Sequence, residues 1–410
     1  MGHPIEQDGL TSALALALDR LRAGDGIGAE QALADAPDDD PRVLHLRAVA
    51  AHLEQRAGDA EELMARAVSR TADRAVVASQ HNDLGNMRLE SGRPAAAVEA
   101  YEASLELQPG DAPTWANLST AHRLGGDTGR AATAALRALE LDREGRLARS
   151  ALAAALHALS SEGRDHEARE VVARWSELDP EHPGARHRLA ALGGLPAPDR
   201  APDEYVETLF DAVAREFDPH LAGLRYRAPE LVADRLAQLV GEPGGSLAVV
   251  DVGCGTGLAG ALLRPWASTL VGCDLSLGML RRAQRRGCYD VLHKAELGTF
   301  LAAQHTAYDV VVSVDTLCYL GDLTEITTAA RGALRPGGWL LATVEELDGT
   351  RGEPWRLTTS GRYAHAEAHL RDITVAAGLV DVQVGRVHLR LEAGLPVEGL
   401  LWSARRPLDG

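Results

Sequence analysis

The chain has few aromatic residues and no long apolar segment. Only 4% of its 410 residues are aromatic. No stretch reaches the ~20 apolar residues that a membrane-crossing helix needs. The N-terminus carries the acidic Glu6 and Asp8 rather than a basic segment ahead of an apolar core, which argues against a secretory signal. We therefore expect a cytoplasmic protein that makes no use of a membrane.

Cysteine is also scarce, and its positions exclude the common cysteine-based scaffolds. The four cysteines all lie in the second half of the chain, at Cys254, Cys273, Cys288 and Cys318. Their spacings match neither a C-x-x-C metal knuckle nor a compact disulfide framework. We expect free thiols in a reducing compartment.

Positive charge is in deficit. The 42 lysine and arginine residues are outnumbered by 59 aspartate and glutamate residues, and the net charge is −17. Because binding to nucleic acid requires a basic face, this balance argues against a DNA or RNA partner. Alanine, leucine and arginine dominate the composition, and these residues favour helices.

A repeat of 34 residues organises the first half of the chain. It occurs twice in succession, over residues 78–111 and 112–145. The first copy has apolar, small and turn residues at Leu84, Gly85, Gly92, Ala97, Tyr101 and Pro109, and the second has them at Trp115, Leu118, Gly126, Ala131 and Ala138. Each copy has the pattern of two amphipathic helices with a glycine in the turn, and the pattern resembles the tetratricopeptide repeat.

Further copies of the repeat are less regular. Residues 146–182 form a third copy with a longer internal turn, and residues 41–75 and 8–40 keep mainly helical periodicity. Stacked repeats commonly present a concave groove, so we expect the array to hold a peptide, a protein or a carrier-bound substrate. The alternative is a helical spacer without a ligand.

Proline and glycine interrupt the helical pattern at residues 192–203, where we place a linker. The predicted domains are therefore a repeat domain over 1–191 and a second domain over 204–410. In the second domain, strands alternate with helical segments, which is typical of a doubly wound α/β sheet. The predicted strands are Leu247–Val252, Thr269–Cys273, Val291–His293, Asp309–Val314, Trp339–Val344, Val380–Val384 and Leu400–Ala404.

The most informative motif follows the first of these strands. The turn Asp251–Gly257 reads Asp-Val-Gly-Cys-Gly-Thr-Gly and leads into a helix that begins at Leu258. Glycine lets the backbone turn sharply and lets a ligand approach without a Cβ in the way. In open α/β sheets nucleotides bind at this position, and Asp274, at the end of the next strand, is placed to take both ribose hydroxyls.

A second interpretation of the same turn is a dinucleotide site. Gly255, Gly257 and Gly260 satisfy the spacing G-x-G-x-x-G. Against it, Asp251 puts an acid at the strand end, which suits the cationic amino group and sulfonium of S-adenosylmethionine better than a pyrophosphate. The full pattern D-x-G-x-G-x-G is also rarer by chance than three glycines.

Residues 203–405 resemble the class I S-adenosylmethionine-dependent methyltransferases, through five segments in the family's order. These segments are 250–257, 273–280, 295–297, 308–315 and 334–341. Together with the repeats, the chain resembles a bacterial group of repeat-containing methyltransferases. The resemblance implies a Rossmann-like fold, S-adenosylmethionine as cofactor and S-adenosylhomocysteine as product. It implies cofactor contacts at Asp251, Gly253, Cys254, Gly255, Gly257, Asp274, Leu275, Ser276, Met279, Ala295, Glu296, Leu297 and Asp315.

Methyl transfer chiefly requires that nucleophile, methyl carbon and sulfur be held in line. A base is needed only when the acceptor must lose a proton. The candidates are Asp315 at the end of the fourth strand, Tyr319, Glu345 and His365, the last in a segment, 360–365, that we interpret as a loop over the site. We commit to Asp315, Tyr319 and His365 as the catalytic residues.

Two smaller features complete the prediction. His365 and His369 have a spacing used in zinc sites, but no third ligand is evident, so we expect no metal. The helical segment 204–230 is expected to cap the cofactor cleft. Its residues Tyr205, Tyr226 and Arg227 either reach the methionine carboxylate or the substrate, or serve packing.

The favoured function is transfer of a methyl group to an O, N or C atom of a small molecule or of a peptide or carrier-bound acceptor. The alternatives are a repeat adaptor whose second domain only binds nucleotide and, less favoured, a nicotinamide-dependent oxidoreductase. Nothing in the pattern of residues names the acceptor or the oligomeric state.

Overall fold

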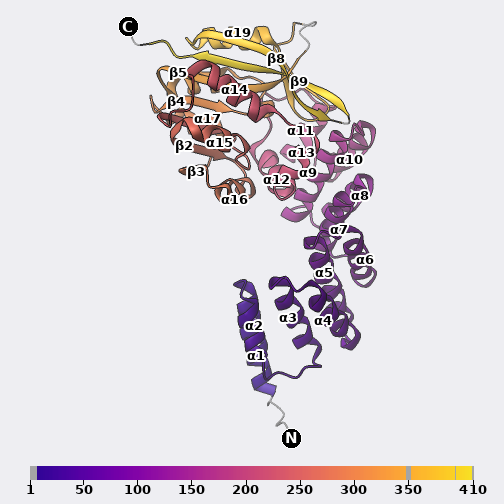
Figure 1. Ribbon diagram of the computed structural model, residues 1–410. Helices are drawn as coiled ribbons and strands as arrows, with labels where there is room; N and C mark the ends of the chain where they lie inside the picture. The colour runs from indigo at the N-terminus through magenta and orange to yellow at the C-terminus, as the bar shows by residue number, and fades with distance from the viewer. Residues whose placement is uncertain (1–6, 348–351, 393, 409–410) are drawn as a thin grey trace. The chain divides into compact units, whose positions relative to one another are not determined.

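A computed structural model describes residues 7–347, 352–392 and 394–408. Spatial contacts divide the chain into two compact units, residues 1–155 and 156–410. The first unit contains α1 (Gln7–Arg22), α2 (Gly26–Ala32), α3 (Pro41–Leu53), α4 (Ala57–Arg70), α5 (Arg74–Glu90), α6 (Pro94–Leu107), α7 (Ala112–Leu124), α8 (Thr128–Leu141) and most of α9 (Arg146–Ser161) (Figure 1).

Aspartate side chains start many of these helices. Asp73 accepts hydrogen bonds from the backbone N–H groups of Ala75 and Val76, and Asp111 accepts one from Thr114. Such caps satisfy N–H groups that have no partner within the helix, and each contributes about 1 kcal/mol. The same kind of cap begins α2, α3 and α8, at Asp25, Asp40 and Asp127.

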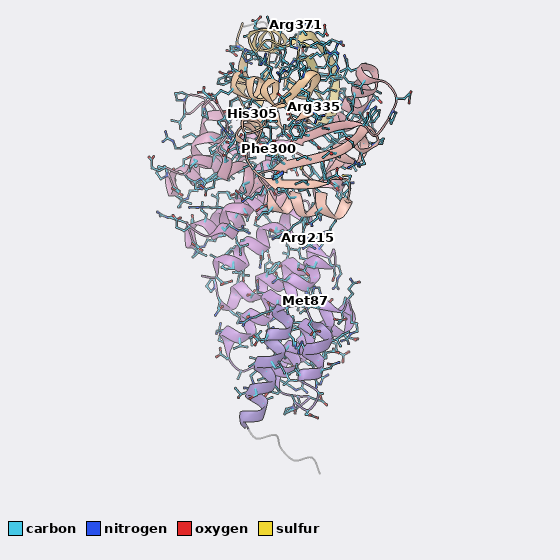
Figure 2. All side chains as sticks on the ribbon, turned by 90° about the vertical axis from the view of Figure 1, so that its left-hand side faces the viewer. Met87, Arg215, Phe300, His305, Arg335 and Arg371 are labelled. Atoms are coloured by element: carbon cyan, nitrogen blue, oxygen red, sulfur yellow. The ribbon has the colours of Figure 1, made fainter. Side chains whose placement is uncertain are left out.

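The paired helices pack through the small residues of the repeat. A Cβ added to Gly85 on α5 would overlap the ring of Tyr101 on α6, which is fully buried. Met87, labelled in Figure 2, is buried in the neighbouring apolar cluster. The repeat pattern therefore marks close helix crossings, as predicted.

The second unit combines helices with one mixed sheet. Its helices are the end of α9, α10 (Asp165–Leu178), α11 (Pro183–Ala191), α12 (Asp203–Val213), α13 (Phe217–Gly223), α14 (Ala228–Val240), α15 (Leu258–Leu263), α16 (Leu277–Arg286), α17 (Leu297–Ala302), α18 (Thr324–Ala333) and α19 (Glu367–Ala376), with short 3₁₀ turns η1 (Arg264–Trp266) and η2 (Leu317–Tyr319). Its strands are β1 (Leu247–Val252), β2 (Ala267–Asp274), β3 (Val291–Lys294), β4 (Tyr308–Ser313), β5 (Leu334–Glu346), β6 (Trp355–Leu357), β7 (Tyr363–His365), β8 (Val380–Glu392) and β9 (Leu395–Arg405).

The strands β3, β2, β1, β4 and β5 lie side by side in this order and are parallel. β9 pairs antiparallel with β5, and β8 pairs with β9. Helices cover both faces of the sheet: α14 and α15 pack on the side chains of one face, and α17, α18 and α19 pack on the other. Phe300 on α17, labelled in Figure 2, is part of the second layer. The predicted doubly wound fold is confirmed.

One part of the sheet differs from the prediction. The segment 360–365, which the sequence indicated to be a loop, is the turn and second strand of a hairpin, β6–β7. β7 pairs with β5 at Glu345 and Glu346, and β9 pairs with the opposite edge of β5. β7 therefore shares an edge of β5 with β4 and lies beyond the end of β4, next to the predicted site.

The predicted linker is part of the second unit and packs against its other residues. The Ala201 N–H donates to the Tyr319 carbonyl at 2.8 Å, and the Gly321 N–H donates to the Asp199 carbonyl at 2.7 Å. Helices α10 and α11, placed by sequence in the repeat domain, also belong to this unit. The domain limits drawn from the sequence stay a prediction.

The structure also bears on the expectations about membrane-crossing helices and cysteines. Within the described ranges, none of the helices is long and apolar enough to cross a membrane. All four cysteines are buried and free.

Candidate active site

The glycine turn between β1 and α15 has the geometry that only glycine adopts easily. Gly253, Gly255 and Gly257 have φ angles of 75°, 53° and 87°. A Cβ on Gly253 would also overlap the side chain of Thr316. The turn is tied to the next strand, because the N–H groups of Gly253 and Cys254 both donate to the Cys273 carbonyl, at 2.8 and 3.0 Å.

Asp274, at the end of β2, faces this turn. One carboxylate oxygen accepts the Gly255 N–H at 2.9 Å, and the other accepts the Ser276 N–H at 2.8 Å. Burial raises the pKa of Asp274, and these backbone hydrogen bonds work in the opposite direction. Ser276 caps α16 through Met279 and donates to Asp211 at 2.6 Å, so it positions the helix that follows.

Asp251, at the end of β1, is fully buried and only half satisfied. Its Oδ2 accepts a hydrogen bond from the Tyr289 hydroxyl at 2.7 Å, and its Oδ1 has no hydrogen-bond partner. Burial raises its pKa to about 7, against the lowering effect of Tyr289. Tyr289 fits here because Gly260 and Gly272 leave room for its ring. A buried carboxylate oxygen without a partner marks a position for a ligand.

These residues line one pocket at the carboxyl ends of the parallel strands. The pocket encloses about 1010 Å³ of empty space, part of it open to solvent. It contains most of the predicted site, namely Asp251, Gly253, Cys254, Gly255, Asp274, Leu275, Met279, Ala295, Glu296, Leu297, Asp315 and Tyr319. Gly257, Ser276 and His365 are absent from its lining.

Glu296 has a structural contact as well as a place in the pocket. Its carboxylate caps α17, accepting the N–H groups of Gly298 and Thr299 at 2.9 and 2.7 Å. It also lies 3.5 Å from the guanidinium of Arg200. Glutamate is not among the residues favoured as a helix N-cap, so the sequence did not indicate this cap, and the contact with Arg200 joins residues far apart in the chain.

Sequence reasoning missed much of the remaining lining. The helices α12, α13 and α14 contribute an apolar wall, which confirms that the segment 204–230 covers the cleft. Of the residues named for that segment, Tyr226 lines the pocket, Tyr205 is buried in a cluster with Tyr319, and Arg227 is absent from the lining. The missed residues are Arg200, Ala201, Asp203, Val206, Phe210, Phe217, Leu221, Pro229, Thr256, Leu258, Ala259, Val314, Thr316 and Leu320.

Asp315 follows β4 in a left-handed backbone conformation, with φ of 53°. This conformation is uncommon outside glycine and often occurs at functional sites. The Asp315 N–H donates to the Thr343 hydroxyl at 2.8 Å. Its Oδ2 lies 2.7 Å from Nη1 of Arg390, while its Oδ1 is buried without a partner.

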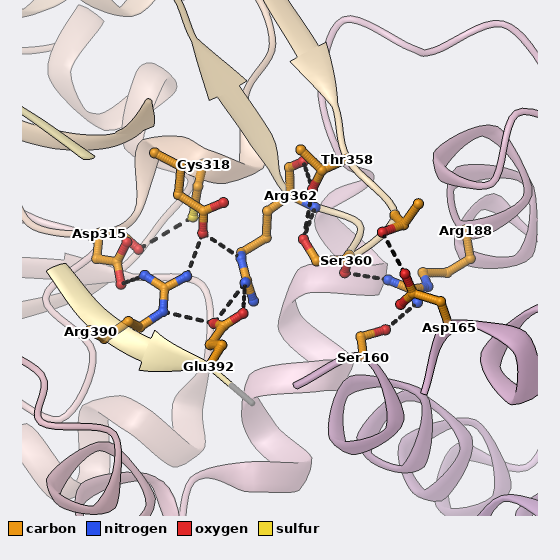
Figure 3. Close-up of polar contacts among 12 residues, drawn as sticks. Ser160, Asp165, Arg188, Asp315, Cys318, Thr358, Ser360, Arg362, Arg390 and Glu392 are labelled. Carbon is orange, nitrogen blue, oxygen red and sulfur yellow. Dashed lines mark hydrogen bonds and ion pairs between the residues drawn. The ribbon is translucent and has the colours of Figure 1, made fainter. Parts of the chain in front are cut away.

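Arg390 connects Asp315 to a buried group of charges, which we call the Asp315 cluster: Asp315, Glu345, Arg362, Arg390 and Glu392 (Figure 3). Arg390 also pairs with Glu345 and, at 2.8 Å, with Glu392. Arg362, from the β6–β7 turn, pairs with the same two carboxylates at 2.7 and 2.6 Å. The side chains of the cluster are between 4% and 16% exposed.

Tyr319, on η2, lines the pocket with its ring against Phe210, at a centroid distance of 5.4 Å. Burial raises the pKa of its hydroxyl well above the usual range, so the phenol stays protonated at neutral pH. Its contacts favour a role in shaping the pocket wall.

The structure does not place His365 in the pocket. Its ring is fully buried, and Nε2 donates to the carbonyls of Leu320 and Gly321 at 2.9 and 3.1 Å. Burial lowers its pKa to about 4, so it is neutral. Its position favours holding β7 against η2 over the predicted catalytic role.

His365 and His369 also fail to share one helix, because α19 begins at Glu367. Among the described residues, no group of three or more histidine, cysteine, aspartate or glutamate side chains is arranged to hold a metal ion.

Comparison with known families identifies two segments. Residues 250–340 match the family model described as "Methyltransferase domain", and residues 81–111 match "Tetratricopeptide repeat". The chain thus contains both elements that the sequence motifs indicated.

Curated relatives are similar over part of their length. Human methyltransferase-like protein 27 is 39% identical over 137 residues, 33% of this chain and 54% of that protein. A ubiquinone biosynthesis O-methyltransferase from Leptothrix cholodnii is 32% identical over 115 residues, 27% of this chain and 48% of that protein. The chain spans about half the length of these relatives.

Solved structures include similar chains. The [4+2]-cyclase SpnF has a TM-score of 0.42 and 19% identity, covering 52% of this chain and 99% of its own. An S-adenosylmethionine-dependent methyltransferase from Mesorhizobium loti has a TM-score of 0.34 and 23% identity, covering 43% of this chain and 100% of its own.

Proposed function

We propose that this chain, which carries a methyltransferase domain and a tetratricopeptide repeat, transfers a methyl group from S-adenosylmethionine to an acceptor bound in the same pocket. The acceptor atom is O, N or C on a small molecule or on a peptide or carrier-bound substrate. The observation that carries the proposal is the pair Asp251 and Asp274 around the glycine turn, inside the segment that matches the methyltransferase domain.

The residues of the pocket fit this cofactor. The orphaned Oδ1 of buried Asp251 suits a cationic amino group, and Asp274 suits two ribose hydroxyls. Glu296, beside Ala295 and Leu297, would accept a hydrogen bond from the adenine amino group. When bound, S-adenosylmethionine supplies a methyl group activated by its sulfonium.

The chain's own contribution is position and desolvation. The apolar wall from α12, α13 and α14 excludes water and holds the acceptor against the ends of the strands. Asp315 lies where a proton can be taken from an acceptor that must lose one, and its pKa is raised by burial. Carboxylate acceptors would need no such base.

Calorimetry with S-adenosylmethionine and with S-adenosylhomocysteine tests the proposal. We expect binding in the micromolar range, and we expect Asp274→Ala to weaken it by about 1–3 kcal/mol, because charge-assisted hydrogen bonds are lost. Asp234→Asn, an exposed residue on α14, is the matched control. No binding by the unmodified chain, or binding of a nicotinamide dinucleotide instead, would refute the proposal.

We also propose that the repeats recruit the acceptor or a partner. A groove in the first unit supports this role. Its lining is largely apolar and includes Leu46 and the exposed Leu18 and Val76. At the same groove both polar atoms of the buried Gln80 amide are without a partner, and an amide can pair with a peptide group.

A further inference from the structure

The Asp315 cluster has one more negative than positive charge. Its carboxylates are Asp315, Glu345 and Glu392, and its guanidinium groups are Arg362 and Arg390. Each guanidinium group is paired with two or three carboxylates of the cluster, so neither arginine is left to pair with a further anion.

Burial makes this imbalance costly. An unpaired charge away from water needs a counter-charge or a proton. The place for a counter-charge is Oδ1 of Asp315, because this oxygen is buried without a hydrogen-bond partner and Asp315 lines the pocket. Burial raises the pKa of Asp315, and the ion pair with Arg390 at 2.7 Å works in the opposite direction by favouring the ionised form.

Aromatic rings line the same pocket as Asp315. The chain has three phenylalanines, and two of them, Phe210 and Phe217, line it together with Tyr226 and Tyr319. Phe210 packs edge-on against both Phe217 and Tyr319, with centroids 5.9 and 5.4 Å apart. Burial raises the pKa of Tyr226, and the carboxylate of Asp315 nearby raises it further. Aromatic faces beside a carboxylate are the chemistry that recognises an ammonium group.

We infer that the methyl acceptor carries a protonated amine, which binds Oδ1 of Asp315, and an apolar body, which packs among the aromatic rings. This inference rests on the proposed function, since it assigns the acceptor class of that site. The amino group of the cofactor has a separate candidate, because Asp251 has its own unpartnered oxygen at the glycine turn. Asp315 is thereby left for the acceptor.

The test compares two probes of equal shape on the full chain loaded with S-adenosylhomocysteine. These are 2-phenylethylamine, charged at pH 7, and the neutral 2-phenylethanol, titrated by calorimetry at 0.15 M salt so that the net charge of −17 is screened. We expect the amine to bind roughly tenfold or more tightly than the alcohol. Equal binding of the two probes, or tighter binding of the alcohol, would overturn the inference.

Asp315→Asn should abolish the preference for the amine, because the carboxylate that pairs with the ammonium group is lost. The control Asp234→Asn should leave the affinities for both probes and for S-adenosylhomocysteine unchanged. If Asp315→Asn weakens S-adenosylhomocysteine instead, Asp315 serves the cofactor and the inference is wrong. Failure of the unmodified chain to bind S-adenosylhomocysteine is a different result, which refutes the proposed function itself.

A second variant covers the case in which Asp315→Asn does not fold. Phe217→Leu keeps an apolar side chain on α13 but removes the aromatic face. We expect the ratio of amine to alcohol affinity to fall by roughly threefold, because the cation–π contribution is lost while apolar contact remains. An unchanged ratio would contradict the aromatic part of the inference.

Discussion

Gly260 has a packing role in the structure, whereas its spacing indicates a role in binding a dinucleotide. In the pattern G-x-G-x-x-G the third glycine belongs to a dinucleotide site. Here a Cβ on Gly260 would overlap the hydroxyl end of Tyr289, the group that donates to Asp251. The glycine therefore makes room for the phenol that sets the state of the buried acid, and the overlap with the dinucleotide pattern has a packing cause.

The pKa of Asp251 predicts a pH dependence for cofactor binding. Because burial raises this pKa to about 7, much of the free protein carries a neutral Asp251 below pH 7. A cationic amino group favours the ionised form, so the affinity for S-adenosylhomocysteine should rise with pH from 5.5 through a midpoint near 7 and level off about one pH unit above that midpoint. Calorimetric dissociation constants across pH 5.5–8.5 measure this directly.

Tyr289→Phe sharpens the same prediction. The Tyr289 hydroxyl lowers the pKa of Asp251, so its removal should move the midpoint of the pH profile above 7 and weaken binding most at neutral pH. Tyr308→Phe is the control, since Tyr308 lies on β4 but does not line the pocket. A profile that is flat, or that Tyr289→Phe leaves in place, would show that Asp251 does not meet the amino group.

At the scale of elements, the β6–β7 hairpin organises the far side of the site. Arg362 in its turn enters the Asp315 cluster, while the same turn is held from outside by α11 (Figure 3). Arg188 donates to the Ser360 carbonyl, and Nε2 of His187 lies 2.9 Å from the Gly361 carbonyl. The β6–β7 turn thus contacts α11 on one side and the Asp315 cluster on the other.

His365 anchors this hairpin, and its removal should affect stability rather than chemistry. His365→Gln should lower the free energy of unfolding at pH 7 by about 1–3 kcal/mol, because the hydrogen bonds to two buried carbonyls are disturbed. Affinity for S-adenosylhomocysteine should be unchanged. Urea unfolding and calorimetry measure the two quantities.

The pH dependence provides an internal check of the same variant. The pKa of His365 is about 4 when folded and near 6.5 when unfolded, so the unfolded chain binds the extra proton between these values and stability falls as pH decreases from 6.5. From pH 7 to pH 5 the unmodified chain should lose about 2 kcal/mol more stability than His365→Gln. Equal losses would indicate that His365 is not buried in its neutral form.

Local patterns account for most of the elements but not for this hairpin. The strands β1, β2 and β4 were predicted from short, mostly apolar runs that precede a turn. β6 and β7 have three residues each, too few to show alternation, and they are held by contacts with distant parts of the chain. The Asp315 cluster also depends on contacts between distant parts of the chain, since Asp315 and Arg390 are 75 residues apart.

The candidate site was predicted best where it is local in sequence. The glycine turn and Asp274 follow directly from strand ends, whereas the segment 295–297 was implied by the family resemblance. The structure brings all three into one pocket. The residues 199–203 were assigned to a linker because proline and glycine exclude regular structure there. Composition carries no information on packing, and these residues supply part of the pocket lining.

At the scale of the whole molecule, the two compact units predict where the chain can be divided. A fragment that begins at Arg143 keeps all of α9 and the second unit, so we expect it to fold and to bind S-adenosylhomocysteine with the affinity of the full chain. A fragment that begins at Glu204 keeps the sequence-defined domain but lacks Arg188 and the residues 199–203.

The shorter fragment should be the less stable of the two and should bind the cofactor product weakly. It loses the clamp on the β6–β7 turn, the backbone hydrogen bonds to Tyr319 and Gly321, and part of the pocket lining. Urea unfolding and calorimetry on both fragments measure these two quantities. If the fragment that begins at Glu204 matches the longer one in stability and in affinity, the prediction is wrong and the methyltransferase domain begins at the sequence-defined linker. If the longer fragment binds the cofactor product fully yet methylates the native acceptor more slowly than the full chain, the first unit acts on acceptor recruitment, because the cofactor site is then intact without it.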